Sequence, residues 1–410
     1  MWGPQKPSPL RMRLARMIVS SCCASGVSML LMARQIALGV GVSMSVPPTL
    51  EFVHSRVRVP GMIVKVPNNM EPNVNVPVAR QGQTGDNGVC NGVASAVHHG
   101  RPVRLHLRPK GFAMSNTTIS KGGLSATISS KGAELTSLAL DGREYLWQAD
   151  PTFWGKHAPV LFPIVGSLRG DEAESAQGTC RMPRHGLARI NEHRVAGVAE
   201  DGSAVTFEFT SSPETLEAYP YEFKLNMTYA ITGEATLTQT FSVTNTGTAD
   251  MPFSVGGHPA FNVPAPGAGD EAFDEYVIEF AEPWTCVAPT IAEGGLLTFD
   301  ETTVPVENVD VLPVTRELFS RDAVMLTDVP GGTLTLRGTK SGRGVRIDFA
   351  DFKYIGIWSA CQGNSPFIAL EPWTGHATLT SEDDVFEHKR NVTVIAPGET
   401  RDFSFSMTVL

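Results

Sequence analysis

The sequence predicts an all-β fold, a large antiparallel β-sandwich preceded by a long N-terminal extension. Three observations predict this class. From residue 124 onward, short runs of alternating apolar and polar residues follow one another, tight-turn residues separate them, and no amphipathic helical pattern intervenes. The 39 glycines and 29 prolines fit the many turns of such a fold.

The alternating runs define the expected strands, which cover residues 124–129, 133–140, 204–210, 224–231, 235–245, 276–280, 333–337, 345–349, 355–359, 367–370 and 401–409. The segments between them contain DG, NTG, PGG and PGE, which supply the tight-turn conformations that hairpins need. The sequence has no repeat with a period of roughly 20 to 50 residues, which argues against a propeller or solenoid.

The chain has two parts of opposite charge. Residues 1–113 contain 13 Lys and Arg against 3 Asp and Glu, a net charge of +10, so the total of −9 leaves −19 on residues 114–410. We therefore expect an extension at 1–113 and one domain at 114–410. The acidic domain is poorly suited to nucleic acid or anionic membranes, whereas neutral sugars are compatible with it.

The extension lacks the pattern of a folded domain. Arg11, Arg13 and Arg16 precede a fairly apolar stretch, as in a signal peptide, but polar residues interrupt it before it reaches the roughly 18 apolar residues of a membrane span. Residues 46–113 have few aromatics and no sustained period, so they bury too little apolar surface to fold. We expect disorder or an upstream start-site assignment with Met114 as the true start; a secretory or anchoring leader is the alternative.

The six cysteines indicate reduced thiols. Cys180, Cys286 and Cys361 lie far apart in the domain, and their odd number argues against a disulfide framework. No CxxC pair or histidine-rich spacing indicates zinc. We therefore expect a cytoplasmic protein with reduced thiols and no zinc site.

Three short segments combine glycine or proline with an ionisable residue where strands are expected to end. They are residues 182–189 (MPRHGLAR), 254–262 (SVGGHPAFN) and 367–375 (FIALEPWTG). Taken singly, each histidine is more often a structural residue, and Glu371 could be an ion-paired strand end. Glu371 would nevertheless lie at the mouth of a sheet, beside an indole that can stack on a sugar.

HGLAR, GGHPAFN and a late EPW, in this order, resemble the aldose 1-epimerase (galactose mutarotase) superfamily, particularly its LacX-like branch. The resemblance covers about residues 117–410 and includes PIVG at 163–166 and YIGIWS at 354–359. It implies the galactose mutarotase-like supersandwich. It also implies an isomerase that interconverts the α and β anomers of a free hexose without a metal or an organic cofactor.

Mutarotation requires a base at the C1 hydroxyl and an acid at the ring oxygen, roles that suit glutamate and histidine. On the resemblance, Glu371 is the base, His258 is the acid and His185 is a second donor to the ring oxygen. Asp322 matches, less closely, a carboxylate that binds sugar hydroxyls.

Phe261 and Trp373 are candidates for an apolar sugar platform, with a core position as the alternative. One position departs from the family, since Ser167 follows Gly166 where an arginine is usual. Arg169 is the residue expected to reach that space, unless it is simply a solvated charge.

Two other functions stay open. A hexose-6-phosphate 1-epimerase would share the acid-base set but needs a basic cluster for phosphate, and only Arg169, Arg184 and Arg189 lie near the motifs. A non-catalytic sugar-binding module would not need both His258 and Glu371.

The expected partner is a monosaccharide, and the expected state is a monomer or homodimer. We also expect His185, His258 and Glu371 to converge on one concave pocket, with His258 and Glu371 about a pyranose ring apart.

Overall fold

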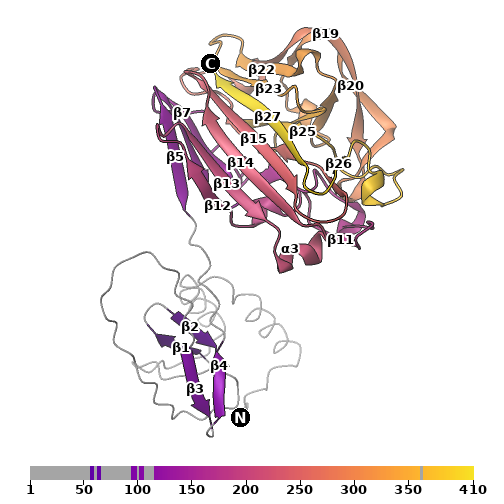
Figure 1. Ribbon diagram of the computed structural model, residues 1–410. Coiled ribbons are helices and arrows are strands. Elements are labelled where there is room, and N and C mark those ends of the chain that lie inside the picture. Colours follow the sequence, from indigo (N-terminus) through magenta and orange to yellow (C-terminus); the bar gives the residue numbers. More distant parts are fainter. Residues whose placement is uncertain (1–55, 60–61, 66–93, 99–100, 106–114, 361–362) are drawn as a thin grey trace, which may run out of the picture. The chain divides into compact units, whose positions relative to one another are not determined.

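The computed structural model describes residues 56–59, 62–65, 94–98, 101–105, 115–360 and 363–410. The chain divides into two compact units, Met1–Pro109 and Lys110–Leu410. Two antiparallel hairpins are described in the first unit (Figure 1), formed by β1 (Arg56–Val59) with β2 (Met62–Lys65) and β3 (Ala94–His98) with β4 (Arg101–Leu105). The expectations for Met114 and for the rest of the extension fall outside the described residues.

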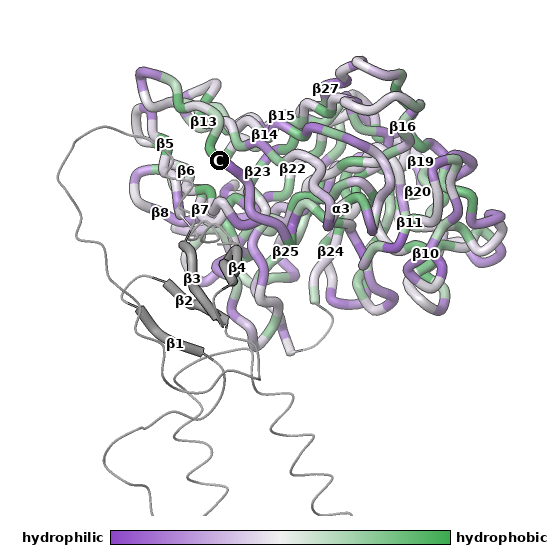
Figure 2. Tube along the Cα trace, turned by 60° about the horizontal axis from the view of Figure 1, so that its bottom comes forward, coloured by the Kyte–Doolittle hydropathy of each residue, from purple (hydrophilic) through white to green (hydrophobic). Residues whose placement is uncertain are grey.

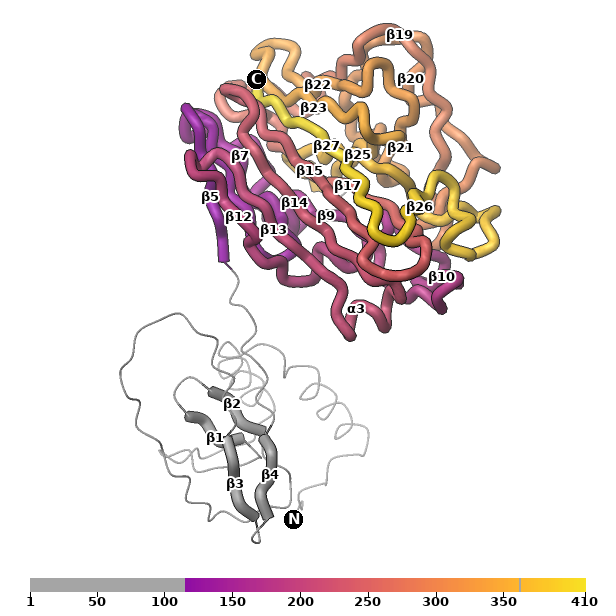
Figure 3. The backbone as a smooth tube through the Cα atoms, viewed as in Figure 1, coloured from indigo at the N-terminus to yellow at the C-terminus, as the bar shows by residue number. Residues whose placement is uncertain are grey.

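A nine-stranded antiparallel sheet forms one layer of the second unit (Figure 3). Its strands, in spatial order, are β12 (Arg194–Val198), β13 (Ala204–Thr210), β14 (Phe223–Ile231), β15 (Thr236–Asn245), β27 (Thr400–Val409), β23 (Gly344–Asp348), β22 (Thr333–Gly338), β19 (Tyr276–Ile291) and β20 (Leu297–Pro313). Buried and partly exposed residues alternate along β14 and β15, as expected when one face of a strand packs on a core.

A six-stranded antiparallel sheet forms the second layer. It contains, in order, β21 (Val324–Thr327), β24 (Tyr354–Trp358), β25 (Phe367–Trp373), β17 (Gly256–Gly257) and β9 (Val160–Leu161), and β18 (Ala260–Asn262) also pairs with β25. The layers are in direct contact, since the Phe162 and Phe223 rings lie 5.0 Å apart and Gly257 lies against Phe405 of β27. The predicted all-β sandwich is therefore confirmed.

Smaller elements complete this unit. A four-stranded sheet contains β5 (Asn116–Lys121), β6 (Leu124–Ser129), β7 (Leu135–Leu140) and β8 (Arg143–Glu144). Two short pairs are β10 (Glu172–Ala173) with β11 (Cys180–Arg181) and β16 (Met251–Phe253) with β26 (Thr393–Ile395). One short α-helix, α3 (Pro213–Ala218), begins with a capping box at Ser212.

In the described part of this unit, the remaining helical turns are 3-10 turns: η1 (Arg169–Asp171), η2 (Ala188–Ile190), η3 (Phe273–Glu275), η4 (Glu293–Gly295), η5 (Glu317–Phe319), η6 (Pro330–Gly332) and η7 (Phe386–His388). Within the described residues, no helix has both the length and the apolarity to cross a bilayer. Hydrophobic and hydrophilic residues are interspersed along the strands (Figure 2), as the alternating pattern predicts.

The two faces of β25 explain where polar groups are placed. Ile368 and Leu370 point into the core between the two sheets. The alternate residues Ala369, Glu371 and Trp373 point to the opposite face, because successive side chains of a strand alternate sides. The outer face of the six-stranded sheet is therefore the one that carries ionisable groups.

Candidate active site

The three segments singled out in the sequence meet at one cavity of about 280 Å³ on this outer face. It is lined by Trp154, Pro159, Val165, Gly166, Arg184, His185, Arg189, His258, Ile291, Gly295, Leu297, Asp322, Ala323, Trp358, Glu371, Trp373 and Ala377. Of the seven residues expected at the site, five are among them: His185, His258, Asp322, Glu371 and Trp373. Phe261 and Arg169 are not.

Strand register brings His258 to Glu371. Gly256 pairs with Trp373 and Ala260 pairs with Ala369, so His258, midway between β17 and β18, lies opposite Glu371. Side chains at opposed positions on neighbouring antiparallel strands lie on the same face and close together. His258 Nε2 is 3.1 Å from Glu371 Oε2, within hydrogen-bonding distance. The expected separation of about one pyranose ring is therefore wrong.

Burial governs the ionisation of both groups. Glu371 is only 2% exposed, and loss of hydration raises its pKa well above the usual value, with a smaller contribution from the charge of Asp322. Burial also lowers the pKa of His258 to about 3, and the charges of Arg189 and Arg184 contribute further. His258 is thus a neutral imidazole near pH 7. The two groups are close enough to titrate as a pair.

His185 has a defined proton position. Its Nδ1 accepts a hydrogen bond from the backbone N–H of Gly166 at 3.1 Å, so in neutral imidazole the proton is on Nε2. Burial, His258 and the neighbouring arginines lower the pKa of His185 well below its usual value. Its ring lies edge-on to that of His258, with 5.9 Å between centroids. His185 therefore presents one N–H donor beside the His258–Glu371 pair.

Aromatic side chains surround the imidazole of His258. The Trp154 ring stacks on it at 4.8 Å, and the Trp358 ring approaches edge-on at 5.8 Å. Sequence reasoning missed both residues. The alternation of β24 could have placed Trp358 on the face shared with Glu371, whereas Trp154 lies in an irregular loop that carries no periodic signal.

Glycines make room for the third indole, Trp373. Gly356 pairs with Glu371 across β24 and β25, and a side chain there would overlap the Trp373 ring. Gly256, on the other side of β25, is crowded by the same ring. Trp373 therefore packs against the backbone of glycines in both neighbouring strands and forms part of the cavity wall.

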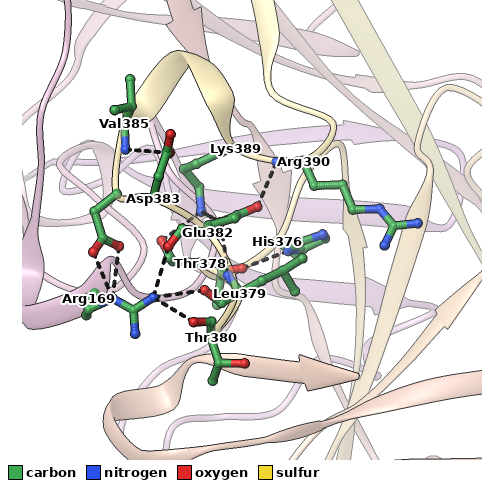
Figure 4. A network of polar contacts seen from close by, with 12 residues as sticks. Arg169, His376, Thr378, Leu379, Thr380, Glu382, Asp383, Val385, Lys389 and Arg390 are labelled. Atoms are coloured by element: carbon green, nitrogen blue, oxygen red, sulfur yellow. Dashed lines mark hydrogen bonds and ion pairs between the residues drawn. The ribbon is translucent and has the colours of Figure 1, made fainter. Parts of the chain in front are cut away.

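Two of the expected residues lie elsewhere. Phe261 of β18 is 2% exposed and belongs to the hydrophobic core, so it offers no platform to a ligand. Arg169 binds Asp384 at 2.8 Å and donates to the carbonyl groups of Leu379, Thr380 and Glu382 (Figure 4). Its Nε and Nη2 are engaged by these partners, and Arg169 is not among the residues that line the cavity.

The arginine network belongs to a polar cluster that holds residues 376–390 in place (Figure 4). Lys389 is buried and donates to Thr378 Oγ1 at 2.8 Å, with Glu382 at 3.5 Å. His376 Nδ1 lies 2.7 Å from the carbonyl oxygen of Ala377. Since Ala377 lines the cavity, this cluster supports the part of the cavity wall that Ala377 forms.

Arg184, not Arg169, occupies the space beside Ser167. Its Nε donates to Ser167 Oγ at 3.0 Å. Asp322 is also at the cavity, in a left-handed conformation with φ of 78°, and its Oδ1 accepts the N–H of Ala323 at 2.9 Å. Asp322 also borders a neighbouring cavity of about 250 Å³. Cations and carboxylates therefore face each other around the two histidines.

The model of the family described as aldose 1-epimerase matches residues 115–393. The chain belongs to the aldose 1-epimerase family. It is 40% identical over 294 residues to the plasmid-encoded protein LacX of Lactococcus lactis subsp. lactis, covering 70% of this chain and 97% of LacX. The match to the chromosomal LacX of the same organism is equally extensive. The protein is thus a LacX-like member, as the motifs indicated.

Solved structures of galactose mutarotase-like proteins share its fold. A galactose mutarotase related enzyme from Lactobacillus acidophilus superposes with a TM-score of 0.67 at 30% identity, covering 72% of this chain and 97% of that one. A galactose mutarotase-like protein from Lactobacillus casei gives a TM-score of 0.65 at 31% identity, with 72% and 100% covered. The described part of the chain contains no group of three or more His, Cys, Asp or Glu side chains arranged to hold a metal.

Proposed function

We propose that this aldose 1-epimerase family member interconverts the α and β anomers of a free hexose by acid-base ring opening, without a cofactor. The convergence of Glu371, His258 and His185 on one cavity is the observation that carries the proposal. A carboxylate and two imidazoles supply the acceptor and the donors that the reaction requires. The non-catalytic binding module is less favoured, because binding alone does not require a buried carboxyl beside two imidazoles.

In the proposed reaction, Glu371 takes the proton of the C1 hydroxyl. The electron pair of that O–H bond forms the aldehyde, and the bond from C1 to the ring oxygen breaks. The ring oxygen receives a proton from the imidazolium form of His258, which arises from the neutral pair when the Glu371 proton moves to His258 Nε2 across the 3.1 Å contact. His185 Nε2–H donates a hydrogen bond to the same oxygen. Rotation about the C1–C2 bond and the reverse steps close the ring to the other anomer. The 3.1 Å contact between His258 and Glu371 orients both groups before the sugar arrives.

Charged residues around the pair affect how readily Glu371 ionises. Glu371 must be ionised to act as a base, which its burial opposes, and the charge of Arg184 partly offsets that effect on its pKa. In this proposal Asp322, which lines the cavity, accepts hydrogen bonds from sugar hydroxyls. Trp154, Trp358 and Trp373 provide apolar surface for the C–H groups of a sugar ring.

A hexose 6-phosphate is the second candidate substrate. Arg184 and Arg189 both line the cavity, and neither has a carboxylate within ion-pair distance among the described residues. Guanidinium groups without a carboxylate partner can bind phosphate oxygens. Asp322 and Glu371 in the same cavity oppose a dianion, so the free hexose ranks first.

Polarimetry tests the proposal directly. Fresh α-glucose, α-galactose and a hexose 6-phosphate are followed with the wild-type protein and with Glu371→Gln, whose amide keeps the shape but cannot act as a base. We expect at least one sugar to equilibrate faster with the wild type, the variant to be inactive, and its sugar affinity to stay within about tenfold of wild type. A folded Glu371→Gln variant with normal turnover would contradict the mechanism. Sugar binding without turnover by the wild type would favour the binding module.

We also propose a cytoplasmic location and a monomer or homodimer that needs only a monosaccharide partner. Cys180 and Cys286 are free and buried, which suits a reducing compartment.

A further inference from the structure

Ser167 binds the Nε atom of the Arg184 guanidinium. The Ser167 side chain is buried, and its backbone is fixed because its carbonyl accepts the N–H of Thr378 at 2.9 Å. Ser167 Oγ accepts the Nε–H of Arg184 at 3.0 Å. A planar guanidinium bound through Nε keeps the edge formed by Nη1 and Nη2 for a second partner. Among the described residues, no protein acceptor is hydrogen-bonded to Arg184 Nη1 or Nη2.

The tip of the hairpin between β19 and β20 leaves space for this guanidinium. Gly295 has φ of 73° and lines the cavity. A methyl group on Gly295 would overlap Arg184 Nη2 and would lie 3.2 Å from Ser167 Oγ. Arg184 therefore lies between Ser167 and the hairpin, in a space that a larger residue at position 295 would close.

The guanidinium also faces the acid-base groups. Its charge lowers the pKa of His185 and His258 and partly offsets the raised pKa of Glu371. All four residues line the same cavity. A cation that is held by Ser167, lines the cavity and has two terminal nitrogens without a protein acceptor matches a pair of neighbouring oxygen atoms on a ligand.

We infer that Arg184 is a substrate-positioning residue that donates from Nη1 and Nη2 to two adjacent hydroxyl oxygens of the sugar, and that Ser167 orients it for this task. The inference rests on the proposed function, because it assigns the polar contacts of the same site. It explains how one wall of the cavity recognises a diol, while Asp322 serves the opposite kind of contact by accepting hydrogen bonds.

The test compares steady-state constants of the full chain with those of Arg184→Ala, Ser167→Ala and the double variant, using whichever free hexose the wild type turns over. We expect Arg184→Ala to raise KM about 10- to 100-fold, as loss of a charged hydrogen-bond donor does, with a much smaller change in kcat. Ser167→Ala keeps the guanidinium but removes the hydrogen bond that orients it. KM should therefore rise by less, about 3- to 10-fold. The double variant should match Arg184→Ala alone, because Ser167 acts through Arg184.

Arg181→Ala is the matched control, since Arg181 is exposed, pairs with Glu172 and lies outside the cavity. Its KM should equal that of the wild type. An unchanged KM in Arg184→Ala, or additive effects of the two single substitutions, would overturn the inference. A rise in KM confined to a hexose 6-phosphate would also overturn it, because phosphate rather than hydroxyls would then be the contact.

If the wild type turns over no sugar, the proposed function fails, and the inference is tested separately through binding. Quenching of the cavity tryptophans by the sugar then reports affinity, and Arg184→Ala should weaken it about 10- to 100-fold. Equal affinities of the wild type and Arg184→Ala would refute the positioning role independently of catalysis.

Discussion

The backbone N–H of Gly166 donates a 3.1 Å hydrogen bond to Nδ1 of His185. A second hydrogen bond joins the same two residues, because the backbone N–H of His185 donates to the Gly166 carbonyl oxygen at 2.8 Å. His185 also has φ of 68°, a left-handed conformation that few side chains tolerate. Backbone geometry thus fixes which nitrogen of this imidazole can donate to a ligand.

His185→Asn removes the Nε2–H donor of the imidazole but keeps the local backbone structure. Asparagine tolerates the left-handed conformation, and its side-chain oxygen can accept the Gly166 N–H, but it has no donor where Nε2 lies. We expect a melting temperature close to that of the wild type and a loss of about 10²-fold in kcat, measured by polarimetry. Unchanged turnover in this variant would show that His185 does not assist ring opening.

Gly356→Ala tests how closely Trp373 is packed. The added methyl group would overlap the indole and push it toward the cavity. We expect a loss of about 1–3 kcal/mol in the free energy of unfolding, as in overpacked cores, and weaker sugar binding. Gly197→Ala is the control, because nothing lies within 4 Å of a methyl group there. Calorimetric titration with the sugar measures the affinity, and wild-type values for Gly356→Ala would refute the packing argument.

His193 should make folding sensitive to acid. It is buried, and burial lowers its pKa from 6.5 to about 4. Between these values the unfolded chain binds a proton that the folded protein does not, so stability falls as the pH drops below 6.5. Its contribution to the loss between pH 7 and pH 5 is about 2 kcal/mol.

Urea unfolding of the wild type and His193→Gln at the two pH values measures this contribution. Glutamine can retain the contact with the Ala188 carbonyl, which lies 3.0 Å from His193 Nε2, but does not titrate. We expect a smaller acid loss in the variant. His388→Gln serves as the control, because Asp383 raises the pKa of His388 and removing it should not reduce the loss. Equal losses in the wild type and His193→Gln would contradict the assignment.

A shortened chain that begins at Met114 should be as active as the full chain. Its strands and the cavity lie within Lys110–Leu410. Polarimetry and limited proteolysis of the full chain check this expectation. A protease-resistant fragment that keeps residues 20–110, or a loss of activity on shortening, would show that the extension contributes.

Strands with one buried face could be predicted from the sequence, and largely exposed strands could not. β13 (Ala204–Thr210) matched its expected bounds, and β14 and β15 matched within one residue, because each has one buried face and therefore alternates. β20 was missed. It is a largely exposed edge strand, rich in acidic residues, so it shows no apolar period. Strands of two or three residues, such as β17, are defined by their partners and leave no pattern of their own.

The site residues that lie within the three family motifs could be predicted from the sequence. His185, His258 and Glu371 were found together, but their distances depend on strand register, which the motifs do not encode. Arg169 was placed at the site because it follows Ser167 closely in sequence. Arg184 fills that space instead, since a loop 17 residues further on folds back to it. Proximity along the chain is a poor guide to proximity across loops.

The place of β27 in the nine-stranded sheet has a consequence for protein synthesis. This strand lies between β15 (Thr236–Asn245) and β23 (Gly344–Asp348), both of which leave the ribosome earlier (Figure 3). Until β27 emerges, β15 and β23 each present an unpaired backbone edge, the kind of surface that recruits other strands. The nascent chain therefore passes through an interval of exposure to misassembly, in which chaperones that shield sheet edges should improve its yield.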